Sequence, residues 1–329
     1  MKKEFLAIIL IICLMVFLAV FLTGFVSAAV KNVDGSCTNT IPGDDPLCDD
    51  GITYLTIQAA IDAASSGDTI NVAAGTYTED LAIPAGKDNL NISGASATIK
   101  GISNVPIASF PLAVPNIEIL SNGVKLHGFT IESPTYVSGK YSSGIVIGAQ
   151  NVAIYNNNFV VNSAGTIDEV SQALQTYATS AIPGVDISGL NVHDNTFTST
   201  GTGAWGYEGI YVNPDLATST VMIQNNIFTG KILRAITSER SKITITGNTI
   251  TTNLIPGDLS APGAFQGINV RNLALAAQSN VIVSNNVIQG ADASKGFHQG
   301  IRIGQSGQVL TNFDIIDNTL QYNTNGILY

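Results

Sequence analysis

The sequence contains few charged residues, and basic residues are the scarcer kind. Only 12% of the 329 residues are charged, and 24 acidic residues against 14 lysines and arginines give a net charge of −10. No basic cluster interrupts this acidic balance. Nucleic acids and anionic membrane surfaces attract proteins through basic patches, so the composition argues against both as partners. Few charges together with many small polar residues are typical of a β-solenoid surface.

Cysteine is also scarce, with three residues in the chain, and the first lies in a long apolar run. Cys13 falls within this run, residues 5–26, which follows Met1-Lys-Lys and precedes Ser27-Ala-Ala. The pattern predicts a secretory signal peptide over residues 1–29. The length of the run also fits an uncleaved N-terminal membrane anchor. Both interpretations place the rest of the chain outside the cytoplasm, either secreted or on the cell surface.

The other two cysteines lie in a polar segment, residues 30–52, which we interpret as a linker. An even pair in an exported chain predicts a disulfide between Cys37 and Cys48 that closes a small loop. Four acidic residues beside it are interpreted as a solvated charge run, with calcium binding as the alternative. They are Asp44, Asp45, Asp49 and Asp50. We therefore expect no cofactor and no other metal site, with calcium left open.

An eight-residue pattern that recurs along the chain is the strongest signal in the sequence. It reads apolar, any, apolar, any, polar, asparagine, any, apolar, and its sixth position is always asparagine. A repeat of this kind governs the prediction of the fold, because it changes the meaning of every other segment. The six copies are Val152–Phe159, Leu190–Phe197, Val221–Phe228, Ile243–Ile250, Val281–Ile288 and Phe313–Leu320.

A second, shorter pattern alternates with the first and reads glycine, apolar, any, apolar. Ala235-Ile236 is a degraded copy of it, and Gly326-Ile327 begins another. One unit is therefore a strand, a turn, a second strand, an asparagine turn, a third strand and a loop of variable length. The copies start at Gly144, Gly184, Gly209, Gly267 and Gly300.

Strands this short are not stable alone, but three of them per coil bury a continuous interior when coils stack. The sequence therefore predicts an all-β parallel solenoid over residues 53–329. We expect the repeated asparagine to adopt the left-handed turn conformation. We also expect its amide to bond the asparagine of the next coil, about 4.8 Å away, in a ladder.

Asparagine turns on stacked short strands resemble the right-handed parallel β-helix of the pectate lyase superfamily. The segment Tyr54–Glu79 also resembles the start of many such proteins. The resemblance covers roughly residues 52–329 and implies this fold. It is specific for fold and weak for activity, because the same fold carries lyases, hydrolases, adhesins and proteins without activity.

The sequence also predicts the structure of the two ends of the solenoid and of one long insertion. Ile57, Ala60, Ile61 and Ala64 share one helical face, which predicts a helix that caps the N-terminal end of the solenoid. Residues 162–183 are interpreted as an insertion, with a short helix over residues 168–177. The last coil is incomplete, so we expect either a truncated sequence or a partner over that end.

In the pectate-lyase-like enzymes the groove follows the first strand of each coil, and the Gly-Ile strands are the counterpart here by resemblance. The outward residues expected on them are Val146, Asp186, Tyr211, Thr237, Asn269 and Arg302. Aromatic rings with polar edges suit sugars, and loop residues often carry binding sites. The predicted substrate-binding residues are Trp205, Tyr207, Tyr211, Asn269 and His298.

Two catalytic arrangements could use residues on or near this face. A glycoside hydrolase needs two carboxylates about 5–9.5 Å apart, for which Asp186 and Glu208 are candidates. A polysaccharide lyase needs a strong base and often a cation, for which Arg271 and Arg302 are candidates. The Asp-Asp, Gly-His-Gly and Arg-Ile-Lys signatures of the polygalacturonase family are missing, and no acidic cluster accompanies the arginines.

The sequence therefore favours an exported β-helix protein that contacts polysaccharide or cell-envelope material along the Gly-Ile face. A polysaccharide lyase or glycoside hydrolase in that groove is the first alternative. A structural stalk or adhesin without a site is the second.

Overall fold

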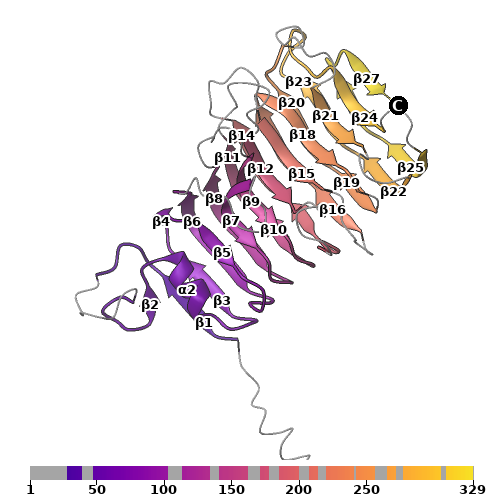
Figure 1. Ribbon diagram of the computed structural model, residues 1–329. Helices are drawn as coiled ribbons and strands as arrows, with labels where there is room; N and C mark the ends of the chain where they lie inside the picture. The colour runs from indigo at the N-terminus through magenta and orange to yellow at the C-terminus, as the bar shows by residue number, and fades with distance from the viewer. Residues whose placement is uncertain are drawn as a thin grey trace, which may run out of the picture.

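Short parallel strands stack coil upon coil along one axis in the computed structural model (Figure 1). The structure describes residues 28–38, 47–102, 113–133, 141–161, 171–177, 185–199, 207–213, 220–240, 242–255, 265–271, 277–304 and 309–328. Within these residues, each complete coil has three strands, one in sheet B and two in sheet A. The predicted parallel solenoid is confirmed.

Sheet B contains the Gly-Ile strands, and each of its strands pairs in parallel with the strand of the next coil. Its strands are β5 (Leu81–Ile83), β7 (Ala113–Ile119), β9 (Tyr141–Ile147), β12 (Ser171–Thr176), β15 (Tyr207–Val212), β18 (Ile232–Ser238), β21 (Gln266–Val270), β24 (Gln299–Ile303) and β27 (Asn325–Leu328).

Sheet A has two arms that meet at the asparagine turn, and β6 (Asn91–Lys100) and β8 (Lys125–Glu132) run through both arms. The first arm contains β1 (Val30–Val33), β3 (Thr69–Val72), β10 (Ala153–Tyr155), β13 (Asn191–His193), β16 (Val221–Gln224), β19 (Ile243–Thr246), β22 (Ala277–Ser284) and β25 (Val309–Ile316). The second arm contains β4 (Gly75–Thr78), β11 (Asn158–Val161), β14 (Thr196–Ser199), β17 (Ile227–Gly230), β20 (Thr249–Thr252), β23 (Val287–Gly290) and β26 (Thr319–Gln321).

The repeated asparagines form the predicted ladder at this corner. Asn195, for example, donates from its backbone N–H and from Nδ2 to Oδ1 of Asn226, at 3.1 and 3.0 Å. The same pair of bonds links each ladder residue to the next. The members are Asn157, Asn195, Asn226, Asn248, Asn286 and Asn318. Because most of these amides are fully buried, each satisfies backbone groups that water cannot reach.

The left-handed backbone conformation belongs to the residue before each ladder asparagine, so the prediction that one asparagine does both jobs is wrong. Asn156, Asn225 and Gly247 have φ of 53°, 55° and 68°, and the other copies place Asp194, Asn285 and Asp317 there. The physical reason is that the turn and the side-chain hydrogen bond fall on two different residues. The fifth residue turns the chain, which leaves the sixth side chain pointing inward to bond the next coil.

Stacked aromatic and aliphatic side chains fill the interior. Phe159, Phe197 and Phe228 are completely buried, with ring centroids 4.6 and 4.5 Å apart. They occupy the eighth position of three successive copies of the repeat, on β11, β14 and β17. Identical positions therefore stack because the coils share one register.

The N-terminal end is closed as predicted by the helix α2 (Ile57–Ala63), which packs against β1, β2 (Thr53–Tyr54), β3 and β5 (Figure 1). Thr56 caps it by accepting a hydrogen bond from the Ala59 N–H at 3.2 Å. Its buried face comprises Ile57, Ala60 and Ile61.

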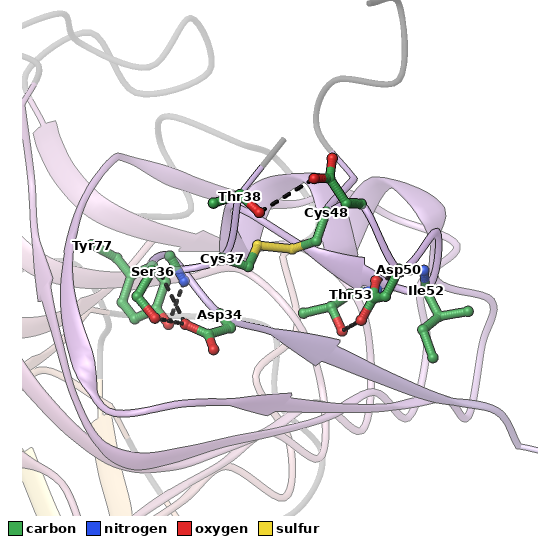
Figure 2. Close-up of a disulfide and its surroundings, with 11 residues drawn as sticks. Asp34, Ser36, Cys37, Thr38, Cys48, Asp50, Ile52, Thr53 and Tyr77 are labelled. Carbon is green, nitrogen blue, oxygen red and sulfur yellow. Dashed lines mark hydrogen bonds between the residues drawn. A yellow bond between two sulfur atoms is a disulfide. The ribbon is translucent and has the colours of Figure 1, made fainter. Parts of the chain in front are cut away.

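The predicted disulfide joins Cys37 and Cys48, whose Cα atoms are 5.8 Å apart (Figure 2). The segment around it differs from a simple linker, because β1 pairs in parallel with β3 from Val30 to Val33. Sheet A thus begins before residue 53. Asp50 accepts hydrogen bonds from Ile52 and Thr53 beside the disulfide, whereas Asp44 and Asp45 lie outside the described residues.

The structure corrects the expected helix over residues 168–177. Residues 171–176 form β12, with Leu174 in register between Ile145 and Ile210. Pairing with strands on both sides overrides the local sequence, which lacks the Gly-Ile pattern. Consequently residues 185–187, which we predicted as the strand of this coil, lie between β12 and β13 without strand structure. Residue 184 and residues 162–170 lie outside the described part.

A second ring stack lies on the outer face of sheet A. Tyr155 stacks between His127 and His193, with centroid distances of 4.5 and 5.0 Å. Burial lowers the pKa of His127, and Lys125 lowers it further. The folded protein therefore binds a proton at His127 less readily than the unfolded chain does. The neutral His127 side chain therefore contributes to the free energy of unfolding above the ordinary histidine pKa. This contribution is lost as the pH falls through the lowered pKa of the folded protein.

We expect His127→Gln to flatten the pH dependence of unfolding on the acid side of neutrality. Urea unfolding at about pH 7.5 and about pH 5, on either side of the ordinary histidine pKa, measures this. The wild-type protein should lose more unfolding free energy between the two pH values than the variant does. Equal losses would show that His127 does not contribute.

Candidate binding site on the outer face of sheet B

The outer face of sheet B carries two polar rows, and in β15 a glycine lies between them. In β15, Glu208 pairs with Gln172 and Tyr211 pairs with Gln175, while Gly209 between them has no paired residue in β12. A Cβ atom on Gly209 would lie 2.4 Å from the Ala235 carbonyl oxygen and 2.5 Å from the Phe228 ring. Only glycine fits this approach, and Glu208 contacts polar side chains on both neighbouring coils.

The first polar row is a continuous chain of side-chain hydrogen bonds across five coils. Gln172 donates to Glu208 at 2.9 Å, and Glu208 forms an ion pair with Arg234. Arg234 then donates to Gln266 at 3.1 Å, and Gln266 donates to Gln299 at 3.1 Å. Because these side chains bond one another under low exposure, each restrains its neighbours in the row.

Beside it, Tyr211, Glu239 and Arg271 form a bonded triangle. The Tyr211 hydroxyl donates to Glu239 Oε1 at 2.6 Å, and Arg271 Nε donates to the same oxygen at 3.0 Å. Arg271 Nη2 also donates to the Tyr211 hydroxyl at 3.2 Å.

Burial raises the pKa of Tyr211, and the Glu239 carboxylate raises it further. Burial alone would lower the pKa of Arg271, but Tyr211 and Glu239 raise it overall. Both groups therefore stay protonated at neutral pH.

The second polar row contains buried groups that have no partner. It follows the register Gln175, Tyr211, Thr237, Asn269 and Arg302. Thr237 and Asn269 are each 1% exposed, yet Thr237 Oγ1 and both amide atoms of Asn269 lack a hydrogen bond in the described structure. Gln172 Oε1 in the first row is also unpartnered. Buried polar groups are rarely left unsatisfied, which points to a ligand on this face.

Arg302 ends the second row on β24, next to Asn269 in register. Among the described residues it forms no ion pair and no side-chain hydrogen bond, in contrast to Arg234 and Arg271. Burial lowers the pKa of Arg302, and the positive charges of Arg271 and Arg234 lower it further. This guanidinium is therefore held near two others without a carboxylate of its own.

Two of the predicted residues lie elsewhere. Asp186 accepts a hydrogen bond from Gln150 at 3.0 Å near the turn after β12, so it does not stand in the row with Glu208. Tyr207 is completely buried and donates its hydroxyl to the Phe197 carbonyl at 3.1 Å. The predicted hydrolase pair and the predicted contact by Tyr207 are therefore wrong.

The other predicted site residues lie in different surroundings. His298 stacks on Phe265, with centroids 5.8 Å apart, and its Nε2 is buried without a partner. Val146 pairs with Gln175 and so lies in the predicted outward row, where it is fully buried. Tyr211, Asn269, Arg271 and Arg302 do gather on the outer face of sheet B. Trp205 lies outside the described residues.

Sequence reasoning missed Glu239, which holds the triangle together. It lies three residues after Ile236, as Arg271 lies three residues after Ile268. Aligning the degraded Ala235-Ile236 copy with the intact copies would have placed Glu239 beside Arg271.

The described part of the chain contains neither a ready metal-binding cluster nor a membrane-crossing helix. No group of three or more histidine, cysteine, aspartate or glutamate side chains is arranged there to hold a metal ion. Among the same residues, no helix has the length and apolar character needed to cross a membrane. The apolar run over residues 5–26 lies outside them.

Comparison with known proteins identifies the fold. No protein-family model and no curated protein matches the sequence. Among solved structures, the chain is similar to a pectin methylesterase from Aspergillus niger, with 15% identity over 88% of this chain and 85% of that chain and a TM-score of 0.50. It is also similar to YbhC from Escherichia coli, with 12% identity over 90% and 85% and a TM-score of 0.51. The chain therefore has the right-handed parallel β-helix fold that its asparagine turns predicted.

Proposed function

We propose that the outer face of sheet B binds a polysaccharide. The observation that carries this proposal is the pair of buried side chains, Thr237 and Asn269, whose polar atoms have no partner in the described structure. Leaving such groups unsatisfied costs about 1–3 kcal/mol each, which a hydroxyl-rich ligand would recover.

The length of the row suits a chain-like ligand. Tyr211, Thr237, Asn269 and Arg302 follow one another on successive coils at about 4.8 Å per step, long enough to face several sugar units. The disulfide between Cys37 and Cys48 supports export, because such bonds persist outside the cytoplasm. A protein of the same fold is named a pectin methylesterase, so the fold accommodates a polysaccharide substrate.

The triangle of Tyr211, Glu239 and Arg271 is better suited to binding a ligand than to transferring a proton. A lyase base has to lose its proton near neutral pH, whereas the pKa values of Arg271 and Tyr211 are both raised. Glu208 and Glu239 are each engaged by an arginine. These groups therefore support a rigid wall beside the ligand.

We expect Asn269→Ala to weaken polysaccharide binding at least about tenfold, the loss of roughly one well-placed bond. Affinity electrophoresis of the purified protein against neutral and acidic polysaccharides measures this, with reducing ends and unsaturated products followed in parallel. Asn158→Ala, an exposed asparagine on the second arm of sheet A, is the matched control and should bind as the wild type does.

Three results would contradict the proposal. No binding to any polysaccharide would favour the structural stalk. If Asn269→Ala and Asn158→Ala bound polysaccharide with equal affinity, the binding site would not lie on the outer face of sheet B. Depolymerisation that disappears on replacing Arg271 would make the protein a lyase.

A further inference from the structure

One asparagine in the sequence carries the acceptor motif for N-linked glycosylation. Asn91-Ile92-Ser93 reads asparagine, any residue except proline, then serine or threonine. No other asparagine in the chain is followed two positions later by serine or threonine. The ladder asparagines lack the motif because the repeat places an apolar residue there, as Phe197 follows Asn195. The sequence therefore offers a single position for an N-linked glycan.

Asn91 lies on the outer face of sheet A. It is the first residue of β6 and is partly exposed, whereas the next residue, Ile92, is completely buried. Because successive side chains of a strand point to opposite faces, Asn91 points away from the core. Its partners in register are Thr69 and Lys125. Sheet B is a separate sheet, so a group attached to Asn91 leaves the outer face of sheet B open.

The two polar atoms of the Asn91 amide have different surroundings. Oδ1 accepts a hydrogen bond from Nε2 of His127 at 3.2 Å. Nδ2, the atom to which a glycan is attached, has no hydrogen-bond partner among the described residues. An attached glycan keeps the amide oxygen and its acceptor capacity. The folded protein therefore accommodates a substituent on Nδ2 without losing the contact with His127.

The packing of β6 determines when the motif is accessible. β6 pairs with β3 on one side and with β8 on the other. Within the motif, Ile92 is buried and Ser93 Oγ donates to Asn71 Oδ1 at 3.0 Å. An enzyme that recognises all three residues needs them in an unpaired chain. Attachment must therefore precede the pairing of β6, while the chain is being exported.

We propose that Asn91 carries an N-linked glycan that is added during export. Asn91 Nδ2 forms a bond to the anomeric carbon of an oligosaccharide supplied on a polyprenyl diphosphate. The bond from that carbon to the diphosphate oxygen breaks, and the amide nitrogen loses one proton. The disulfide between Cys37 and Cys48 supports the export that this step requires. The inference does not depend on the polysaccharide site, which lies on the other sheet.

The test secretes the full chain, residues 1–329, from a yeast host whose own exported proteins carry N-linked glycans. Peptide mass spectrometry of the secreted protein, before and after enzymatic release of N-linked glycans, reports on position 91. We expect a glycan on the wild-type peptide and conversion of Asn91 to aspartate on release. Asn91→Gln and Ser93→Ala should both abolish the modification, whereas Ser93→Thr should retain it.

His193→Ser is the matched control for the host and for this face of the protein. Asn191 occupies the same outward register as Asn91, through Lys125 and Ala153, and the substitution completes the motif there. We expect this variant to carry glycans at both asparagines.

Four results would contradict the proposal. An unmodified Asn91 beside a modified Asn191 would show that the host and the face are competent but that Asn91 is not an acceptor. No glycan at either asparagine would exclude this face as an acceptor surface. A modification that persists in Ser93→Ala would not be N-linked glycosylation of this motif. Retention of the chain inside the cell would overturn the export on which the inference rests.

Discussion

Replacing Asn226 by alanine is expected to destabilise the protein by at least about 3 kcal/mol. The side chain is completely buried in the middle of the ladder. Its Oδ1 accepts two bonds from Asn195, and its Nδ2 donates to the Val192 carbonyl at 2.9 Å and to Asn248 at 3.0 Å. Alanine leaves the Asn195 backbone N–H and the Val192 carbonyl without these partners, and each buried orphan costs about 1–3 kcal/mol. Urea unfolding followed by circular dichroism measures the loss.

The neighbouring residue supplies a matched control. Asn225 has φ of 55° and turns the chain. Asn225→Ala therefore adds only the cost of a left-handed alanine, about 1–2 kcal/mol. Equal losses for the two alanine variants would mean that the ladder contributes no more than the turn, against our interpretation of the sixth position.

The second large effect is expected for Phe197→Ala, at about 3–5 kcal/mol. Phe197 is the middle ring of the interior stack and is completely buried between Phe159 and Phe228. Alanine opens a cavity that the strands cannot close, because coils on both sides fix their spacing, and it removes two ring contacts. The loss is measured as a lower urea midpoint.

Tyr155→Ala is the control for this prediction. Tyr155 is also the middle of three stacked rings, but it lies half-buried on the outer face of sheet A. Because folding removes less apolar surface of Tyr155 from water than of Phe197, we expect Tyr155→Ala to lower the free energy of unfolding by roughly half as much or less. A larger loss for Tyr155 than for Phe197 would contradict a core that derives its stability from the interior stack.

The repeat in the sequence predicted the fold because each of its positions has one structural role. Asparagine at position six identified the ladder, and phenylalanine, isoleucine or leucine at position eight identified the interior stack. The Gly-Ile pattern located sheet B, because glycine is needed where a Cβ atom at Gly209 would meet the Ala235 carbonyl. These roles are local and recur in each coil, so they can be read without coordinates.

The sequence was less informative where a coil departs from the repeat. It indicated a helix for the segment that became β12, because residues 171–176 carry no Gly-Ile signal and only pairing with β9 and β15 makes them a strand. The same error moved Asp186 into a row that Gln175 occupies. A misassigned coil therefore changed a candidate catalytic residue.

By itself, the sequence determined the solenoid, its capping helix, the cysteine pair and the face that carries Tyr211, Asn269, Arg271 and Arg302. The tertiary structure alone decided that Tyr207 is buried and that Glu239 joins Tyr211 to Arg271. It also decided that the side chains of Asn269 and Arg302 have no partner among the described residues. The physical reason is that these contacts join residues on different coils, tens of positions apart, with loops of unequal length between them. Strand register, which the local pattern does not encode for every coil, selects which side chains meet.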